Sequence, residues 1–218
     1  MIHKLEADSI QLEFGLRSVL TDVYLKCETG SITGLLGRNG QGKTCLMNII
    51  YGNMKASYKS IRFDGVFVHK PFKRSDLVSY LPQFNFIPIS LTLKRIFSNF
   101  GLPFADFENH FPEFKQQYHS SLANLSGGQR RLVEVYVIIK SKSQFAMLDE
   151  PFSHILPLHI EQIKELLLSE KCNKGFLLTD HMYRQIIDIC DHLYVLANGK
   201  VHLTKNTADI EKLGYARL

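Results

Sequence analysis

The chain has 218 residues, of which 45% are hydrophobic and 22% charged, and a formal net charge of +5. This composition is ordinary for a soluble globular protein, and the length suits one large domain or one domain with a small insertion. No apolar run reaches the roughly 18 residues of a membrane span, and the amino terminus lacks the apolar core of a secretory signal. We therefore expect an intracellular protein, whose modest positive charge does not by itself identify an anionic partner.

The four cysteines, Cys27, Cys45, Cys172 and Cys190, are far apart in the sequence and form no C-x-x-C pair. In an intracellular protein, scattered cysteines of this kind are expected to be buried, reduced thiols. We assign no metal site to them.

The first part of the chain predicts strands. Residues 10–14 and 23–27 alternate apolar and polar side chains, which is typical of half-buried strands, and Gly15 marks a turn between them. Residues 32–36 form an uninterrupted apolar run, which indicates a strand buried on both faces.

Directly after this buried strand comes the sequence Gly37-Arg38-Asn39-Gly40-Gln41-Gly42-Lys43-Thr44, which fits the phosphate-loop pattern G-x-x-x-x-G-K-[ST]. The residues from Cys45 onward predict the first turns of a helix, so the pattern has the strand–loop–helix context that it needs. The glycines let successive N–H groups point inward at a helix N-terminus, where the helix dipole also favours anions. We expect Lys43 to reach the β- and γ-phosphates of a nucleotide, and the Thr44 hydroxyl to bind Mg²⁺.

The middle of the chain changes in character. Three further short strands are expected at residues 60–63, 66–68 and 77–81. Asp64-Gly65 between the first two is a strong hairpin signal. Residues 84–124 are rich in phenylalanine, contain three prolines and show helical patterns near 91–100 and 106–118. We interpret residues 84–124 as a small helical insertion.

The rest of the chain alternates helices and strands. Helices are expected from Ser126 to Ile139, at residues 157–169, and from His181 to about Asp191. Strands are expected at residues 144–150 and 174–179, and two edge strands are expected around the turn Asn198-Gly199. Strands that alternate with helices after residue 31 imply a largely parallel sheet and an α/β fold.

The second decisive stretch is Leu125-Ser126-Gly127-Gly128-Gln129. With the phosphate loop before it and Met147-Leu148-Asp149-Glu150 after it, the chain resembles the ATP-binding cassette (ABC) ATPases over almost its whole length. The resemblance is specific because five motifs of the family occur in the expected order. It implies a P-loop NTPase (RecA-like) core with a mostly parallel sheet, an N-terminal antiparallel β subdomain and a short helical insertion.

The same resemblance implies a domain division and a set of catalytic roles. Residues 1–218 would form one ABC ATPase domain, with residues 1–83 and 125–218 as the catalytic core and residues 84–124 as the insertion. Asp149 matches the Walker B aspartate near Mg²⁺, and Glu150 matches the carboxylate that orients or deprotonates the attacking water. Phosphoryl transfer is catalysed mainly by positioning and charge stabilisation, which suits one carboxylate for the metal and its neighbour for the water.

Two more residues gain a role only from their positions relative to these motifs. Gln83 matches the glutamine of the family's Q-loop, which contacts Mg²⁺ or water. His181 follows a predicted strand and matches the switch histidine, which contacts the γ-phosphate. With Lys43 and Glu150, these residues make up the catalytic set that the resemblance implies. The other histidines, including His154 and His159, are expected to be ordinary polar residues.

The signature residues Ser126, Gly127, Gly128 and Gln129 imply a second ABC ATPase subunit, because in the family they bind the γ-phosphate of ATP held by the other cassette of a head-to-tail pair. The N–H groups at the start of their helix favour phosphate. A second copy of the chain is the expected partner.

Phe14 is at the position of an aromatic residue that stacks on adenine, an interaction worth roughly 1–3 kcal/mol in nucleic-acid systems. The alternative for Phe14 is a place in the core of its strand.

The loop after Glu150-Pro151 departs from the family pattern. Where the family has a sequence like Ser-Gly-Leu-Asp-Pro, residues 153–157 read Ser-His-Ile-Leu-Pro, so that Leu156 stands at the aspartate position. This loop normally crosses to the opposite ATP site, and the departure therefore bears on the coupling between the two sites.

The resemblance predicts an ATP-hydrolysing, Mg²⁺-dependent subunit of an ABC transporter, with ATP and Mg²⁺ as its ligands. It would work at the cytoplasmic face of the membrane with a separate integral membrane permease. No nucleic acid is expected as a partner, since the stretch between Gln83 and Leu125 is too short for the coiled coil of chromosome and repair ATPases. The alternative is a soluble ABC ATPase that acts with scaffold proteins, as in iron–sulfur assembly.

Eight of the 15 phenylalanines lie between positions 84 and 114. They could form the core of the insertion and its seam with the main sheet. Alternatively, some of them could line an exposed groove after Gln83, since exposed apolar surface often marks a partner site. In the family, a short helix of the membrane subunit docks here by the helix-in-groove mode.

Overall fold

The computed structural model describes residues 1–204, 207–213 and 215, which form two sheets surrounded by helices. The strands are β1 (Lys4–Phe14), β2 (Arg17–Glu28), β3 (Ile32–Leu36), β4 (Tyr58–Phe63), β5 (Val66–Phe67), β6 (Val78–Leu81), β7 (Phe145–Asp149), β8 (Gly175–Thr179), β9 (His192–Ala197) and β10 (Lys200–Thr204). The α-helices are α1 (Lys43–Tyr51), α2 (Leu93–Phe100), α3 (Phe104–His110), α4 (Gly127–Ile139), α5 (Pro157–Glu170), α6 (Tyr183–Ile187) and α7 (Thr207–Lys212). Three short 3₁₀ helices are η1 (Pro71–Lys73), η2 (Pro112–Phe114) and η3 (Leu122–Asn124).

The larger sheet has six strands in the order β10-β9-β3-β8-β7-β6. Strands β9, β3, β8, β7 and β6 are parallel to their neighbours, and β10 pairs antiparallel with β9. This arrangement confirms the expected α/β fold with a mostly parallel sheet. The expectation of two edge strands around Asn198-Gly199 was wrong for β9, which lies between β10 and β3.

The smaller sheet is antiparallel, with the strand order β2-β1-β4-β5, and confirms the expected N-terminal β subdomain. Its strands β1 and β2 are longer than the alternation predicted. A register shift between Ala7 and Ile10 interrupts the alternation, and Ser9 within it has a φ of 52°. Asp64 and Gly65 have φ values of 50° and 78° and make the tight turn expected between β4 and β5.

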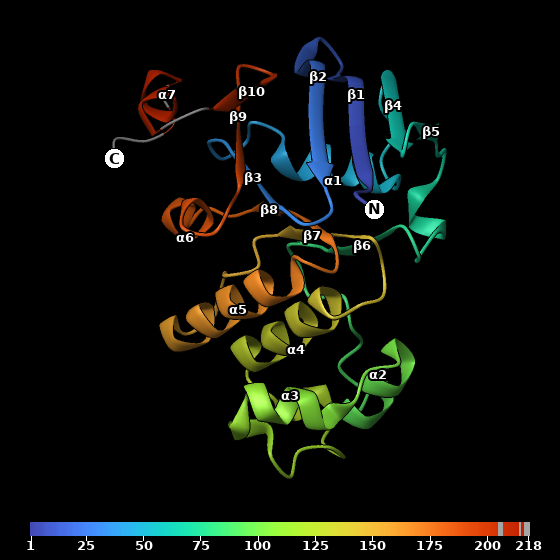
Figure 1. The fold of residues 1–218 in the computed structure, drawn as a ribbon, viewed down its shortest axis with the longest axis vertical. Helices are drawn as coiled ribbons and strands as arrows, with labels where there is room; N and C mark the ends of the chain where they lie inside the picture. Colours follow the sequence, from blue (N-terminus) through green and yellow to red (C-terminus); the bar gives the residue numbers. More distant parts are fainter. Residues whose placement is uncertain (205–206, 214, 216–218) are drawn as a thin grey trace.

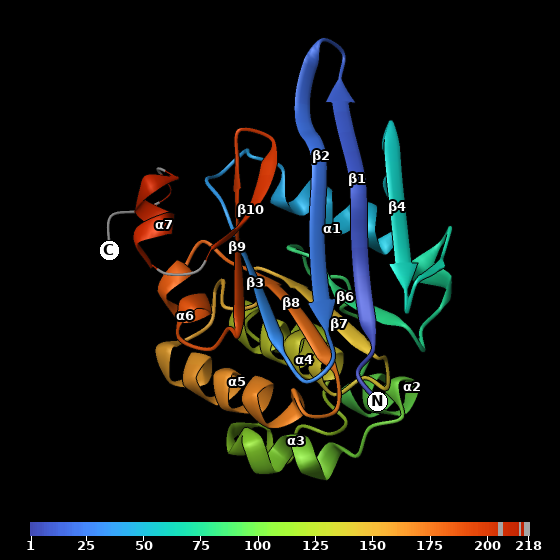
Figure 2. The same cartoon turned by 45° about the horizontal axis from the view of Figure 1, so that its top comes forward.

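The central strands β3, β7 and β8 of the six-stranded sheet are buried on both faces. Figures 1 and 2 show α4 and α5 on one side of it, with α1 and the antiparallel sheet on the other. Successive side chains alternate between the two cores: Leu148 joins the core with α4 and α5, whereas Met147 joins the core with α1. A strand buried on both faces needs apolar residues at every position, which explains the uninterrupted runs in the sequence.

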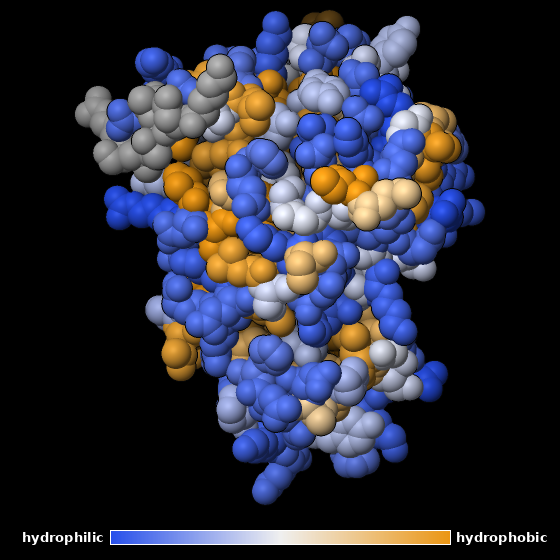
Figure 3. All heavy atoms as spheres, viewed as in Figure 1, coloured by the Kyte–Doolittle hydropathy of each residue, from blue (hydrophilic) through white to orange (hydrophobic). Residues whose placement is uncertain are grey.

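The phenylalanines of residues 84–114 mainly form the core of the insertion. Phe97, Phe107, Phe111 and Phe114 are at most 1% exposed, and the Phe107 ring lies 4.9 Å from the ring of Tyr136 on α4. On the face seen in Figure 3, the lower part of the molecule, which holds the insertion, is mostly hydrophilic. The groove alternative remains open for Phe86 and Phe100, which are partly buried and pack against this core, and for Phe84, which is 72% exposed.

Two expected helices end earlier than predicted. The pattern near 106–118 forms α3 only to His110, followed by Phe111 with φ −130° and ψ 79° and then by η2. Proline lacks an N–H and disfavours helical geometry in the residue before it, so Pro112 ends α3. Helix α6 ends at Ile187, because Asp191 exchanges hydrogen bonds with the backbone of Ile32 through its own N–H and its Oδ2 atom.

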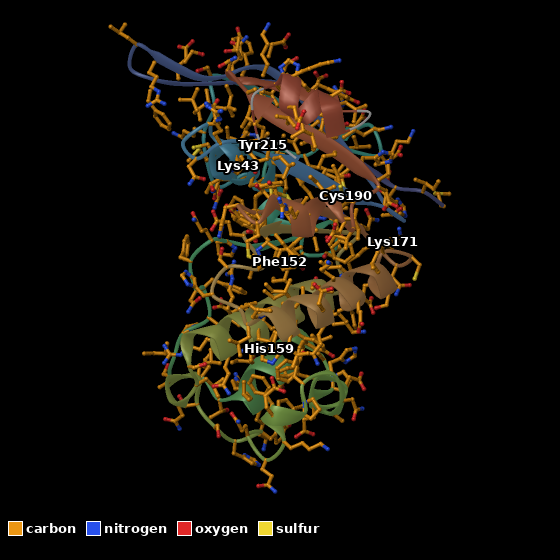
Figure 4. All side chains as sticks on the ribbon, turned by 90° about the vertical axis from the view of Figure 1, so that its left-hand side faces the viewer. Lys43, Phe152, His159, Lys171, Cys190 and Tyr215 are labelled. Atoms are coloured by element: carbon orange, nitrogen blue, oxygen red, sulfur yellow. The ribbon has the colours of Figure 1, made fainter. Side chains whose placement is uncertain are left out.

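Helix α5 also holds the insertion against the core. The Nε2 atom of His159 lies 2.7 Å from Oε1 of Glu113 in η2, at the place where α5 meets the insertion (Figure 4). The ring of His159 also packs edge-on against that of Phe111. His159 therefore has a structural contact, as expected for a histidine outside the motifs.

The four cysteines are free, as expected, but their burial differs from the prediction. Cys27 is buried, Cys45 and Cys190 are partly buried, and Cys172 is exposed. Cys172 lies two residues after the end of α5, where the chain turns back toward β8 at the surface. In the part of the chain that the structure describes, no helix has the length and apolar character of a membrane span.

Candidate active site

The phosphate loop connects β3 to α1, as its sequence context predicted. Gly40 and Gly42 have φ values of 79° and 103°, a conformation that other residues adopt only with strain. A Cβ atom at Gly37 would lie 2.8 Å from the carbonyl oxygen of Leu196, and one at Gly42 would lie 2.9 Å from Val19. The loop is therefore packed tightly against β9 and β2, and only glycine fits at these two positions.

The start of α1 is prepared for an anion. No side chain of the described residues caps this end of the helix, and its first turn contains no acidic residue. The Nζ atom of Lys43 donates hydrogen bonds to the carbonyl oxygens of Gly37 at 2.6 Å and Arg38 at 3.4 Å. Burial lowers the pKa of Lys43, and the charges of Asp149 and Glu150 oppose this shift. The free N–H groups and the lysine together match the requirements of a phosphate group.

Asp149 ends β7 below the phosphate loop and is 1% exposed. Its Oδ2 atom accepts a hydrogen bond from the Tyr80 hydroxyl at 3.3 Å, and Asn48 of α1 donates to the same hydroxyl at 3.4 Å. Burial raises the pKa of Asp149, whereas interactions with the hydroxyl groups of Thr44 and Tyr80 lower it. Thr44 and Asp149 thus lie together, and their oxygens are the ligand type that Mg²⁺ prefers. Tyr80 is a member of the site that the sequence analysis missed.

Glu150 lies in a small polar cluster with Ser153 and His181. The Ser153 hydroxyl donates to Oε2 of Glu150 at 3.0 Å, and the Nδ1 atom of His181 lies 3.6 Å from the same oxygen. His181 is also 3.3 Å from Oδ1 of Asp180, whose two oxygens accept hydrogen bonds from the backbone N–H groups of Phe152 and Met182. The side chain of Glu150 is 18% exposed and that of His181 54%, so both remain accessible to a ligand.

A cavity of about 370 Å³ brings together Phe14, part of the phosphate loop, Gln83 and Glu150. It is lined by Phe14, Arg17, Val19, Asn39, Gly40, Gly42, Lys43, Thr44, Cys45, Gln83 and Glu150. Figure 4 shows Lys43 on α1, above the layer of α4 and α5. The side chain of Phe14 is 56% exposed at the end of β1 and does not belong to the core of its strand.

The cavity also contains residues that the sequence did not single out. Arg17 pairs with Phe14 across the hairpin of β1 and β2, and Val19 follows it on β2. The turn at Gly15 was the available signal, because it places residue 17 beside residue 14. Arg38 and Gln41 instead line a neighbouring cavity of about 250 Å³, together with residues of β9 and the C-terminal segment. His181 and Asp149 are not among the residues that line the larger cavity.

The signature residues lie apart from this cavity. Ser126 caps α4: its hydroxyl accepts from the Gln129 N–H at 3.2 Å, and the Gln129 side chain accepts from the Ser126 N–H at 2.9 Å. This reciprocal capping box fixes the start of α4. A Cβ atom at Gly128 would lie 2.8 Å from the carbonyl oxygen of His154, so the loop after Glu150 packs directly on the signature glycine. None of the residues Ser126–Gln129 lines the phosphate-loop cavity.

Comparison with known proteins agrees with these features. A family model described as ABC transporter matches residues 20–153, which include the phosphate loop, the signature stretch and the end of β7. The chain belongs to the ABC transporter family. This result confirms the family that the order of the motifs indicated.

Curated relatives of this ABC chain are similar over most of its length. The lipopolysaccharide export system ATP-binding protein LptB of Haemophilus influenzae is 28% identical over 92% of this chain and 89% of the relative. A probable ABC transporter ATP-binding protein of Azorhizobium caulinodans is 33% identical over 90% of this chain and 75% of the relative. A solved structure of the ATP-binding subunit of an ABC transporter has a TM-score of 0.81 and 24% identity, and covers 97% of this chain and 93% of that chain. The structural likeness supports the ABC ATPase fold.

Proposed function

We propose that this ABC chain is the ATP-hydrolysing, nucleotide-binding subunit of a transporter whose membrane-spanning subunits are separate chains. The observation that carries the proposal is the joint lining of one cavity by Lys43 and Thr44 of α1, Gln83 after β6, and Glu150 after β7. These side chains supply a cation, a hydroxyl, an amide and a carboxylate at one place, as phosphoryl transfer to water requires.

The residues at and next to this cavity have the chemical groups that would bind ATP and Mg²⁺. Phe14 would stack on adenine, while the N–H groups from Gly37 through Cys45 and the ammonium of Lys43 would bind the phosphates. Thr44, Gln83 and Asp149 would hold Mg²⁺. The metal ion would neutralise charge that develops on the phosphate oxygens.

Glu150 would accept the proton of the attacking water or orient it, because its carboxylate is at the edge of the cavity. The hydroxyl of Ser153 and the ring of His181 hold the side chain in place at 3.0 Å and 3.6 Å from Oε2. Asp180 holds the ring in turn, at 3.3 Å from Nδ1. His181 would turn to the γ-phosphate, for which its 54% exposure leaves room.

A second cassette is part of the proposal. The signature residues Ser126–Gln129 do not line the phosphate-loop cavity, and they form the capped start of α4. A head-to-tail pair of two copies would place the signature of each copy on the ATP of the other. Leu156, at the usual aspartate position, is 66% exposed and would lie in the loop that crosses to the opposite site.

The membrane subunit would dock in a groove beside the insertion. A cavity of about 450 Å³ is lined by aromatic residues of four segments, namely Tyr51 of α1, Phe72 of η1, Tyr80 of β6, and Phe86 and Phe100 on the insertion side. A short amphipathic helix fits a groove of this kind. The names of relatives, including the high-affinity branched-chain amino acid transport ATP-binding protein BraG of Pseudomonas aeruginosa, support a role in transport. Attachment there would keep the chain at the cytoplasmic face of the membrane.

The test is phosphate release by the purified chain with ATP, with and without Mg²⁺, for the wild type and for Glu150→Gln. We expect Mg²⁺-dependent hydrolysis by the wild type and a loss of about 10²-fold or more in the variant, with ATP binding retained. Equal rates for the two proteins would refute the role of Glu150. Co-purification with soluble scaffold proteins in place of a membrane protein would favour the scaffold-bound alternative.

A further inference from the structure

A buried pair of opposite charges, Arg131 and Glu134, lies on the face of α4 that points toward the candidate active site. The two side chains are 4% and 1% exposed, with 3.6 Å between Nη1 of Arg131 and Oε2 of Glu134. Burying such a pair gains little net stability, because desolvation of both charges offsets their attraction. Neither residue is part of the motifs described above. The burial of the pair therefore has to be explained by the groups that the two side chains contact.

Arg131 uses its guanidinium on backbone carbonyl groups of two segments. Its Nη1 atom donates to the carbonyl oxygen of Pro82 at 2.8 Å, and its Nη2 atom donates to those of Asp149 at 2.8 Å and Glu150 at 3.0 Å. One rigid, planar group thus joins the residue before Gln83 to the two carboxylate residues at the end of β7.

Glu134 holds the other end of the segment that contains Gln83. Its Oε1 atom accepts hydrogen bonds from the N–H groups of Phe86 at 2.8 Å and Ile87 at 3.0 Å. The segment 82–87 is therefore fixed to α4 at both ends, while Gln83 between them stays exposed. The side chain of Phe86 lines the groove proposed for the membrane subunit.

The Glu150 backbone is in a conformation that needs such support. Its φ is 53°, in the left-handed region that residues other than glycine rarely adopt. Such a conformation persists only where the surroundings hold it. Here the N–H of Glu150 donates to the carbonyl oxygen of Thr179 at 2.7 Å, and its carbonyl oxygen accepts from Arg131. Arg131 is thus one of the contacts that hold the Glu150 backbone, from which the side chain projects, in this conformation.

We propose that Arg131 and Glu134 form a positioning pair that relays the conformation of segment 82–87, and hence occupancy of the docking groove, to the backbone of Glu150. The pair touches no reacting atom and acts through the placement of the Glu150 carboxylate. This inference rests on the proposed function, because it assigns the pair a role in ATP hydrolysis and in its coupling to the groove.

The first test is steady-state ATP hydrolysis by Arg131→Lys and Glu134→Gln, each measured below its melting temperature. Lysine keeps the charge but cannot donate along two directions from a planar group. We expect kcat to fall roughly 10- to 100-fold in Arg131→Lys and less in Glu134→Gln, because a small misplacement of a catalytic group has effects of this size. The KM for ATP should stay within about threefold, since binding does not use the pair.

The matched control is Glu170→Gln, which removes the acid of the ion pair between Lys140 and Glu170 at the other end of α4, with a distance of 2.6 Å. Its kcat should remain within about twofold of the wild type, as expected for a partly exposed ion pair. Unchanged kcat in both Arg131→Lys and Glu134→Gln would overturn the proposal. Failure of both variants to fold would also overturn it, because the pair would then be a structural element only.

The second test detects the relay itself by hydrogen–deuterium exchange of the Phe86 and Ile87 amides. In a Glu150→Gln background, addition of ATP and Mg²⁺ should change this exchange. The same addition should have no effect when Arg131→Lys is also present. A merely structural pair would give faster exchange in the double variant with the ATP response unchanged, which would overturn the relay. If the wild type hydrolyses no ATP, the proposed function fails instead, and this outcome is distinct from normal kcat in the Arg131 and Glu134 variants.

Discussion

The Nζ atom of Lys43 donates a hydrogen bond of 2.6 Å to the carbonyl oxygen of Gly37, so the lysine closes the phosphate loop on itself. Bound phosphate would take over part of this role, because a charge-assisted bond to an anion is stronger than one to a neutral carbonyl. This contact therefore holds the ammonium group at the phosphate loop.

We predict that Lys43→Met weakens ATP binding by roughly 10- to 100-fold, which corresponds to the loss of about 1.5–3 kcal/mol for a hydrogen bond to a charged group. The measurement is the rise of the melting temperature with ATP concentration in the presence of a chelator, so that no hydrolysis occurs. Lys55→Met, at an exposed position, serves as the control and should respond to ATP as the wild type does. An unchanged response of Lys43→Met would contradict the assigned role.

ATP should drive dimerisation of the Glu150→Gln variant, because the signature of one copy and the phosphate loop of the other complete each ATP site. Light scattering with and without ATP measures this. Adding Leu156→Asp should shift the transition to lower protein concentration, since aspartate is the residue that the family has in this loop. Leu158→Asp is the matched control, with 72% exposure against 66% for Leu156. A monomer at saturating ATP and high concentration would indicate that a different cassette is the partner.

Two phenylalanine substitutions separate the groove from the core. Phe86→Ser should leave ATP hydrolysis by the isolated subunit largely intact, because the contact with Glu134 uses the backbone N–H, but it should weaken co-purification of the membrane subunit. Phe107→Ser should instead lower stability by about 3–5 kcal/mol, as for other large-to-small changes at a fully buried ring. Chemical denaturation measures the stability of both variants. Loss of the melting transition in Phe86→Ser would place that ring in the core and refute the groove at that position.

Asp149 makes the stability of the ligand-free protein depend on pH in a defined direction. Burial raises its pKa above the value of roughly 3.9 expected in the unfolded chain. Between these two pKa values, the folded state keeps a proton that the unfolded state has lost, so the contribution of Asp149 to the free energy of unfolding falls as pH rises. Above the folded pKa the contribution is constant.

We therefore predict that the free energy of unfolding of the wild type, minus that of Asp149→Asn, decreases as pH rises from about 4, measured by urea denaturation without nucleotide or Mg²⁺. Taking this difference removes the contributions of the other carboxylates to the pH dependence. One of these is Asp180, since burial also raises its pKa. A difference that increases with pH would show that the contacts with Thr44 and Tyr80 outweigh burial.

The sequence predicted the parts of the site that are encoded in continuous stretches. The phosphate loop, the strand before it and the helix after it all follow from one pattern of glycines, apolar residues and Lys43. The end of β7 and the capped start of α4 follow from equally local signals, since Ser126 and Gln129 are three positions apart and form a capping box. Residues of this kind can be predicted without knowing which distant segments of the chain contact each other.

The missed features depend on contacts between distant segments. In the sequence, Tyr80 is one residue of a predicted short strand. Its hydroxyl reaches Asp149 only because β6 and β7 lie side by side in the sheet. The sequence analysis gave Arg131 and Glu134 no role beyond their place in a helix, yet both are buried. A charged residue on a helix carries no local sign that a neighbouring loop will cover it.

The unequal burial of the cysteines makes the wild-type chain a ready substrate for site-specific labelling. Burial raises the pKa of Cys27 to about 12 and that of Cys190 to about 11, and it also raises the pKa of Cys45, so these thiols form little of the nucleophilic thiolate at neutral pH. Cys172 is the exposed member. A maleimide fluorophore added in equimolar amount should attach there first, at the C-terminal end of α5, and give an optical reporter of assembly without any engineered cysteine.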